Sequence, residues 1–268
     1  MQVKTKQQNG PNSSGETPPR FQVLSVRLHA VTWEETFQKI GLWVAQKQPH
    51  YINVCSVQTV LDSYDSQDLT QIVNCSGMAV PDGMPLVWLG KLTGNPVDRI
   101  YGPDLVLSLC ERGQNLDYRH FFYGGSPGIA DRMSENLRRR YPQLQIVGTC
   151  SPPFRDLTPQ EEEETAQMIN QARPDIVWVG LGTPKQDFWM ARMRPLLQAP
   201  VLIAVGAAFD LHSGRIRQAP HWMRNTGLEW LFRLLMEPRR LWRRYLIGNP
   251  RFIYLIFKQF TNQKRPTS

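Results

Sequence analysis

Three short segments of the chain combine glycine with polar residues in a way that suits phosphate binding. They are residues 123–127, 179–187 and 205–210, and each follows an apolar run typical of a buried strand. Glycine lets backbone N–H groups approach a phosphate, and a helix that follows adds the positive end of its dipole. One such turn alone is more often an ordinary strand-to-helix connection. Three in one sheet favour a nucleotide ligand.

A candidate acid or base is Asp82, in the segment Pro81-Asp82-Gly83. A Pro-Asp-Gly sequence is most often a plain surface turn. Residues 78–80 nevertheless have the pattern of a strand leading into this turn, which would put the carboxylate at the ligand-binding edge of a sheet. A carboxylate whose pKa is raised by burial can act as a general base on a hydroxyl group.

The positive charge of the chain is concentrated at its C-terminal end. The whole chain carries +8, but residues 215–268 hold twelve Lys and Arg against two acids, so the remainder is slightly acidic. Tryptophan and tyrosine, which favour membrane interfaces, are interleaved with these arginines. Any single arginine is adequately explained by a solvated helix face. The collective excess favours an anionic lipid surface or a diphosphate as partner.

Several other functional classes find no support in the sequence. The five histidines are dispersed without the spacing of metal ligands, so neither a metal nor a cofactor is predicted. The chain shows no signal-peptide pattern and no apolar run of about 18 residues, so no membrane span is expected. We therefore expect a cytoplasmic protein that is peripheral on the inner face of the plasma membrane.

Apolar runs alternate in period along the chain, which predicts strands and helices in turn. Strands are expected at residues 21–28, 51–54, 78–80, 120–123, 145–148, 175–179 and 201–205, and helices lie between them. After Asp210 the strand pattern stops, and helices are expected at residues 222–236, 238–247 and 252–260. The predicted fold class is α/β, a Rossmann-like doubly wound, mostly parallel sheet with a basic helical C-terminal appendage. Residues 1–20 should form a disordered leader, 21–210 the core and 211–268 the appendage.

The sequence resembles the WecG/TagA/CpsF family of glycosyltransferases over about residues 21–245. The resemblance rests on a series of motifs in the family's order: Pro81-Asp82-Gly83, Arg99-Ile100-Tyr101-Gly102-Pro103-Asp104-Leu105, Gly124-Gly125, Gly180-Leu181-Gly182-Thr183-Pro184-Lys185-Gln186-Asp187, Gly206-Ala207-Ala208-Phe209-Asp210, Ala219-Pro220-His221-Trp222, Gly227-Leu228-Glu229-Trp230 and Glu237-Pro238-Arg239-Arg240. It implies an inverting, metal-independent enzyme that moves an N-acetylhexosamine, of the N-acetylmannosamine type, from a UDP-sugar. The implied acceptor is a sugar on polyprenyl diphosphate, used in cell-surface polysaccharide synthesis. The appendage is implied to dock on the membrane and to help close the active site.

The resemblance also implies roles for individual residues. Asp82 would be the catalytic base that takes the proton of the acceptor hydroxyl. The residues implied to contact or shape the nucleotide pocket are Gln186, Asp210, Gly182, Thr183 and Gly206, with Gly124 and Gly125 in the first glycine turn. Arg99 and Gly102 share a motif near the donor sugar. Candidates for the diphosphate are Arg224, Arg233 and Arg240.

One departure from the family pattern affects the donor-sugar region. The usual Thr-x-Asn after the second strand reads Asn53-Val54-Cys55 here, although Asn53 can still donate and accept hydrogen bonds. This change leaves the identity of the sugar open.

Two rival functions use some of the same features. A non-catalytic module that binds nucleic acid or anionic lipid would explain the charge but not the three glycine turns, so no nucleic-acid partner is expected. A Rossmann methyltransferase or dehydrogenase is disfavoured because the dinucleotide fingerprint is absent. Whether the chain forms a homo-oligomer is left open.

Overall fold

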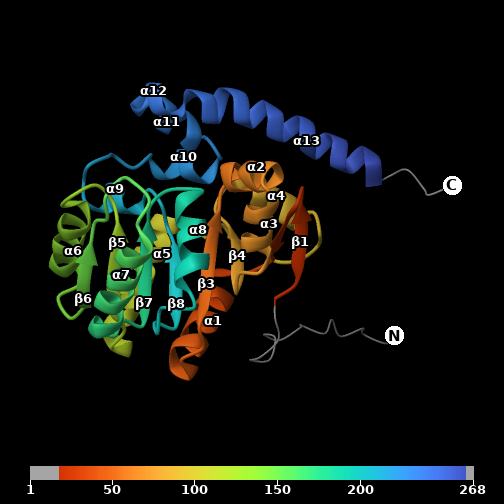
Figure 1. Cartoon of the computed structure of the whole chain (residues 1–268). Coiled ribbons are helices and arrows are strands. Elements are labelled where there is room, and N and C mark those ends of the chain that lie inside the picture. Colours follow the sequence, from red (N-terminus) through yellow and green to blue (C-terminus); the bar gives the residue numbers. More distant parts are fainter. Residues whose placement is uncertain (1–17, 264–268) are drawn as a thin grey trace, which may run out of the picture.

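The computed structural model describes residues 18–263, and its centre is a six-stranded sheet whose paired strands are all parallel (Figure 1). The strand order is β4-β3-β8-β7-β5-β6. The strands are β3 His50–Cys55, β4 Met78–Pro81, β5 Arg119–Gly124, β6 Gln145–Cys150, β7 Ile176–Gly180 and β8 Val201–Ala204. The prediction of an α/β fold with a mostly parallel sheet is confirmed.

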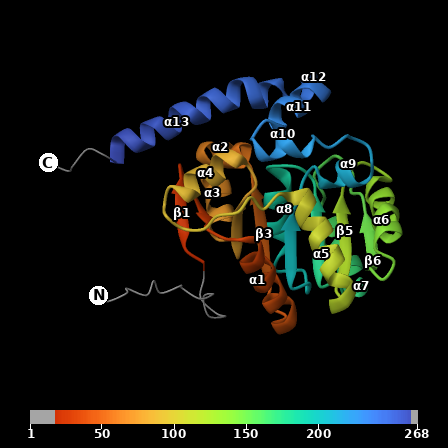
Figure 2. The ribbon, with the colours of Figure 1, turned by 180° about the vertical axis from the view of Figure 1, so that it is seen from behind.

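Helices cover both faces of the sheet (Figures 1 and 2). One face packs against α1 (Trp33–Gln46), α5 (Gly102–Leu116) and α6 (Ile129–Arg140), and the other against α7 (Pro159–Ala172) and α8 (Lys185–Met193). In strand β7, Trp178 packs against the face covered by α1, α5 and α6, and its neighbours Val177 and Val179 pack against the face covered by α7 and α8. A sheet buried on both faces is built almost entirely of apolar side chains. Polar groups that could do chemistry therefore collect where the strands end.

Two helices begin where the sequence places their caps. Thr32 precedes α1 and Thr158 precedes α7, and each accepts a hydrogen bond from the backbone N–H three residues later. A glutamate at that third position, Glu35 or Glu161, bonds back to the cap residue. This reciprocal arrangement satisfies backbone groups that the first turn of a helix leaves free.

The predicted strand at residues 21–28 is wrong, because the segment folds into a hairpin. Strands β1 (Arg20–Val23) and β2 (Val26–His29) pair antiparallel, and Leu24 turns the chain with a φ of 53°. Apolar residues alternate in both arms, and the turn contains neither glycine nor asparagine. The sequence consequently looks like one continuous strand. The hairpin packs with α2 (Val57–Asp65), α3 (Gln67–Asn74) and α4 (Met84–Lys91) beyond the β4 edge of the sheet.

The C-terminal helices lie across the end of the sheet to which the parallel strands point, as Figures 1 and 2 show. Their bounds are α9 Ala208–His212, α10 His221–Asn225, α11 Glu229–Met236, α12 Pro238–Trp242 and α13 Gly248–Gln263. The predicted helix at residues 222–236 is in fact two helices, because Gly227 breaks it with a φ of 78°. The predicted helix at 238–247 ends in a π-helical turn, residues 243–247, that runs directly into α13.

The appendage is packed on the core through apolar and polar contacts. Leu241 and Phe252 are buried, and Phe252 joins the cluster around the β1–β2 hairpin. On α13, Arg251 pairs with Asp65 of α2 at 2.6 Å, and the Gln259 side chain accepts a bond from the backbone N–H of Leu24 at 2.8 Å. Within residues 18–263, no helix combines the length and the apolar character that crossing a bilayer requires.

Helix α9 and strand β1 lie at the two boundaries that the sequence predicts for the core. Helix α9 spans the boundary predicted at residue 210, so the covalent connection between core and appendage is helical. Most of the predicted leader lies outside the described residues. Its last residue, Arg20, already belongs to β1.

Candidate active site

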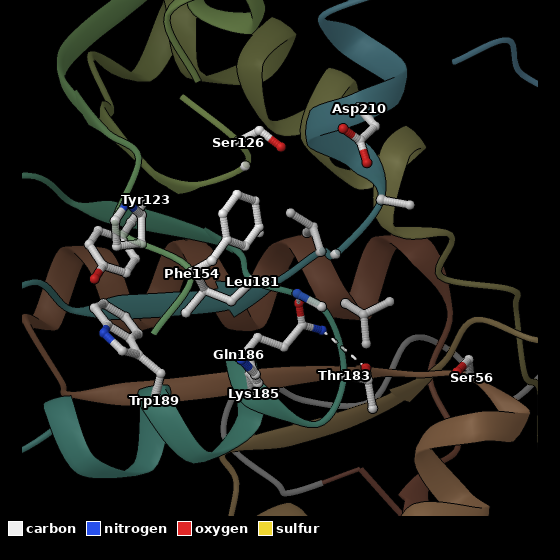
Figure 3. A pocket seen from close by; sticks show the side chains of 18 of the residues that line it. Ser56, Tyr123, Ser126, Phe154, Leu181, Thr183, Lys185, Gln186, Trp189 and Asp210 are labelled. Atoms are coloured by element: carbon white, nitrogen blue, oxygen red, sulfur yellow. Dashed lines mark hydrogen bonds between the residues drawn. The ribbon is translucent and has the colours of Figure 1, made fainter. Parts of the chain in front are cut away.

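A cleft of about 550 Å³ opens where the parallel strands end and the appendage covers them. In an open α/β sheet, ligands bind in this position, and the volume falls within the range of about 300–1,000 Å³ for small-molecule sites. Figure 3 shows its walls, with Ser126 and Asp210 on one side, Thr183 and Gln186 on the other, and Phe154 near Tyr123 at one end. Of the residues predicted from sequence, those that line the cleft are Asp82, Gly125, Gly182, Thr183, Gln186, Gly206, Asp210, Arg233 and Arg240.

The first glycine turn is held against the end of β7. A Cβ atom on Gly124, whose φ is +138°, would lie 2.6 Å from the backbone of Gly180. The next N–H, that of Gly125, donates to the Gly180 carbonyl at 3.0 Å. Only glycine adopts the positive φ of Gly124 freely. Gly124 therefore shapes the cleft from behind, while Gly125 faces into it.

The second glycine turn is organised by Gln186. Its side chain accepts a hydrogen bond from the N–H of Gly182 at 3.2 Å and donates to Thr183 Oγ1 at 3.4 Å (Figure 3). Gln186 is almost fully buried at the start of α8, and it also lies against Gly206 of the third turn. One amide side chain thus connects two of the three predicted glycine turns.

Asp82 directly follows the last residue of β4 and lies beneath the appendage. Its backbone N–H donates to Cys55 O at 2.8 Å, which fixes the turn beside β3. The Oδ1 atom is buried and has no hydrogen-bond partner among the described residues. Burial raises the pKa of Asp82 to about 6, and the negative charge of Glu229 acts in the same direction. A carboxylate with this pKa is a competent proton acceptor near neutral pH.

Arg99 links Asp82 to the appendage. Its Nη2 lies 3.5 Å from Asp82 Oδ1 and 2.5 Å from Glu229 Oε2 on α11. Its Nη1 donates to the carbonyl of Arg224 at 2.8 Å. The hydroxyl of Tyr101 donates to the other Glu229 oxygen at 2.8 Å, and the Arg99 guanidinium lies over the Tyr101 ring. Arg99 therefore contacts Asp82 from the side away from the cleft and does not itself line the cleft.

The appendage contributes three arginines to one side of the cleft. Arg233 of α11, Arg240 of α12 and Arg244 of the π-helical turn line it together. Arg244 donates to Ser56 Oγ at 3.0 Å. Within residues 18–263, Arg233 and Arg244 form no ion pair, whereas Arg240 pairs with Glu237 at 2.9 Å. Two partly buried guanidinium groups thus face the cleft with their charge uncompensated by a direct partner.

Several predicted site residues lie behind the cleft. Arg224 pairs with Asp104 at 3.0 Å, and Gly102 packs the start of α5 on Val205. Asn53 is buried in β3, where its amide donates to Asp187 Oδ1 at 2.5 Å. The residues of the predicted set that do not line the cleft are Asn53, Arg99, Gly102, Gly124 and Arg224.

Two residues outside the predicted set belong to this arrangement. Glu229 and Arg244 both line the cleft beside Asp82. Glu229 is one of only two acids in the basic segment 215–268, and that rarity was the available signal. Arg244 follows Arg243 directly, and without a known helix phase the sequence could not indicate which of the two faces inward.

The arrangement can bind an anionic ligand and remove a proton next to it. The glycine turns of the core lie on one side and arginines of the appendage on the other, and the Asp82 carboxylate also lines the cleft. Among residues 18–263, no three His, Cys, Asp or Glu side chains are grouped as metal ligands.

Comparison with known proteins identifies a family and two similar enzymes. The model of the glycosyl transferase WecG/TagA/CpsF family matches residues 21–266. The chain is similar to two N-acetylglucosaminyldiphosphoundecaprenol N-acetyl-beta-D-mannosaminyltransferases. That of Bacillus spizizenii is 28% identical over 84% of this chain and 85% of its own length. That of Bacillus subtilis is 29% identical over 83% of this chain and 84% of its own length.

Proposed function

Since this chain belongs to the WecG/TagA/CpsF family of glycosyltransferases, we propose that it transfers N-acetylmannosamine, or a close relative of it, from UDP to a sugar on polyprenyl diphosphate. Both relatives are named as mannosaminyltransferases that act on N-acetylglucosaminyldiphosphoundecaprenol. The observation that carries the proposal is the position of Asp82, between the glycine turns of the core and Arg233 and Arg244 of the appendage.

The donor is proposed to lie in the cleft with its diphosphate among the cations. Negative charge develops on the departing UDP, and preorganised donors aimed at that charge lower the barrier. Backbone N–H groups near Gly182 and Gly206 would supply one side, and Arg233 and Arg244 the other. These groups would neutralise the leaving group, which is how the reaction proceeds without a metal in this proposal.

Asp82 is proposed to take the proton from the acceptor hydroxyl as that oxygen attacks the anomeric carbon. Attack opposite the departing UDP inverts the configuration at that carbon. The raised pKa of Asp82, about 6, brings the carboxylate closer in proton affinity to the hydroxyl it must deprotonate. The covering appendage would exclude water and so suppress hydrolysis of the donor.

The appendage is also proposed to hold the enzyme on an anionic membrane surface. Of the nineteen large apolar residues that are exposed within residues 18–263, twelve lie at or after Trp222, although this segment is less than a fifth of the chain. Exposed arginines, such as Arg239 and Arg243, accompany them. Basic residues contribute about 1 kcal/mol each near an anionic leaflet. Peripheral attachment to the inner face of the plasma membrane follows from this proposal.

A UDP-release assay tests the proposed reaction directly. UDP formation is measured over a panel of UDP-sugars with a polyprenyl-diphosphate-linked N-acetylglucosamine as acceptor. We expect release that depends on the acceptor and is fastest with UDP-N-acetylmannosamine. Acceptor-independent release, or no release with any UDP-N-acetylhexosamine, would overturn the proposal.

A further inference from the structure

We propose that an apolar groove between α4 and α13 binds the first isoprenoid units of the acceptor, so that acceptor and donor reach Asp82 from different sides. The groove has a volume of about 740 Å³ and meets the cleft that would hold the donor at Asp82. The inference rests on the proposed function, because it assigns a place to the lipid part of that acceptor.

Two helical stripes form the walls of the groove. On α4 the stripe contains Pro85 and Trp88, and on α13 it contains Ile253 and Phe257. The spacing of three and four residues puts each stripe on one face of its helix. The apolar and aromatic residues that line the groove are Val57, Met84, Pro85, Trp88, Leu89, Leu92, Leu228, Trp230, Tyr245, Phe252, Ile253, Ile256, Phe257 and Phe260.

These walls are unusually exposed for side chains of their size. Trp88 is 50% exposed, Leu92 75% and Phe257 69%. Contiguous apolar surface of this kind in a soluble protein marks a site where an apolar partner binds. Its shape is a groove between two helices, which suits a chain better than a flat protein surface.

The groove is continuous with the catalytic residues at one end. Five residues line both the groove and the cleft: Ser56, Asp82, Glu229, Arg233 and Arg244. From this junction α13 runs away across α2, and its far end is fixed to the β1–β2 hairpin through Gln259 (Figure 1). The groove is therefore polar and cationic beside Asp82 and apolar along α13.

This order of surfaces matches the order of groups in the acceptor. A hydroxyl on the acceptor sugar must reach Asp82, the diphosphate follows the sugar, and the hydrocarbon follows the diphosphate. Arginine binds diphosphate through charge-assisted hydrogen bonds, and Arg99 and Arg224 line the groove but not the donor cleft. The isoprenoid requires an apolar wall. A fatty acid would explain the apolar wall and the arginines but offers no hydroxyl for Asp82 to deprotonate, and a second protein copy would explain the apolar wall alone.

The first test measures binding without requiring catalysis. Farnesyl diphosphate and inorganic diphosphate are titrated into the full chain by calorimetry. We expect farnesyl diphosphate to bind at least tenfold more tightly than inorganic diphosphate. The substitutions Trp88→Gln and Phe257→Gln should reduce this advantage severalfold and leave inorganic diphosphate binding unchanged.

Tyr254→Gln is the matched control. Tyr254 lies on α13, is 63% exposed and does not line the groove. Its substitution removes a similar amount of exposed aromatic surface, so any loss through general membrane or micelle affinity would appear here too. An equal loss in the Tyr254 and Phe257 variants, or equal wild-type affinity for the two probes, would overturn the groove assignment.

A second test separates this inference from the proposed reaction. Transfer is compared between an acceptor with a polyprenyl chain and one with a short alkyl chain. Phe257→Gln should raise KM severalfold for the polyprenyl acceptor only. If no transfer occurs but farnesyl diphosphate still requires Phe257, the proposed function fails and the groove assignment stands. If transfer occurs and Phe257→Gln changes KM equally for both acceptors, the groove assignment fails.

Discussion

Glu229 of the appendage and Arg99 of the core form an ion pair with 2.5 Å between Oε2 and Nη2, directly beside the proposed base. The same guanidinium lies 3.5 Å from Asp82. Glu229 therefore raises the pKa of Asp82 by its charge, while Arg99 lowers it. The appendage thus contributes to the proton affinity of a residue that belongs to the core.

Glu229→Gln should shift the pH dependence of catalysis to lower pH. Asp82 must be deprotonated to accept a proton, so the acid limb of kcat/KM should follow its pKa, which is about 6 in the native chain. Removing the nearby negative charge lowers that pKa, and we expect the limb to move down by up to about one unit. Glu34→Gln, at a remote ion pair with Arg112, is the control. A shift toward higher pH would contradict this electrostatic role.

Asp82→Asn should lower kcat by about 10²–10⁴-fold, the usual contribution of a positioned general base. The amide has nearly the same shape but cannot accept the hydroxyl proton. Affinity for UDP, measured by calorimetry, should remain within a few-fold of the native value, because the proposed diphosphate contacts are left in place. Asp68→Asn, at an exposed position on α3, controls for the loss of one negative charge. Native turnover in the Asp82 variant would remove the assignment.

The core could be predicted from the sequence because its signals are local. The apolar run of β7 and the capping pair Thr158–Glu161 depend only on neighbouring residues, and both elements are found. The position of Asp82 was also predictable, because a short strand leading into a turn fixes which end of the sheet the turn occupies. The single strand expected at residues 21–28 is wrong because the reversal at Leu24 contains neither glycine nor asparagine to mark it.

The appendage could be predicted in composition but not in detail. Its charge indicates that arginines gather at the site, yet only three-dimensional packing decides which of them face the cleft. Arg224 forms an ion pair with Asp104 behind the cleft, whereas Arg244, which is outside the predicted set, lines the cleft. The break at Gly227 and the π-helical turn at residues 243–247 change the helical phase. A periodicity argument across the appendage therefore assigns the wrong faces.

Arg244→Ala and Arg233→Ala should each weaken UDP binding by about tenfold or more. A hydrogen bond to a charged group contributes about 1.5–3 kcal/mol, and each guanidinium faces the cleft without an ion-pair partner in the described part of the chain. Arg239→Ala is the matched control, because Arg239 is exposed on α12 and does not line the cleft. Calorimetric titration with UDP checks the three variants. An equal loss in the Arg239 variant would indicate only a general charge effect.

Asp187→Asn should remove a pH-dependent loss of stability. Burial raises the pKa of Asp187 to about 7, and Asn53 donates to only one of its oxygens. The second carboxylate oxygen and the Asn53 oxygen are both buried without a partner, so a proton on Asp187 supplies a donor that this pair lacks. The folded state consequently binds a proton that the unfolded state has released above pH 3.8. The contribution of Asp187 to the free energy of unfolding is therefore fully present below about pH 4, and it is lost progressively as the pH rises to about 7.

The size of this effect allows a clear measurement. The raised pKa of Asp187 corresponds to a loss of unfolding free energy on the order of 4 kcal/mol between pH 4 and 8, at about 1.36 kcal/mol per pKa unit. Urea unfolding at pH 5 and pH 8 should show a smaller difference for Asp187→Asn than for the native chain, because the new amide can donate to the Asn53 oxygen at every pH. Asp82 contributes a pH dependence of the same sign, but it is present in both proteins and cancels in the comparison. An unchanged difference in the Asp187 variant would mean that Asp187 is ionised in the folded chain throughout this range.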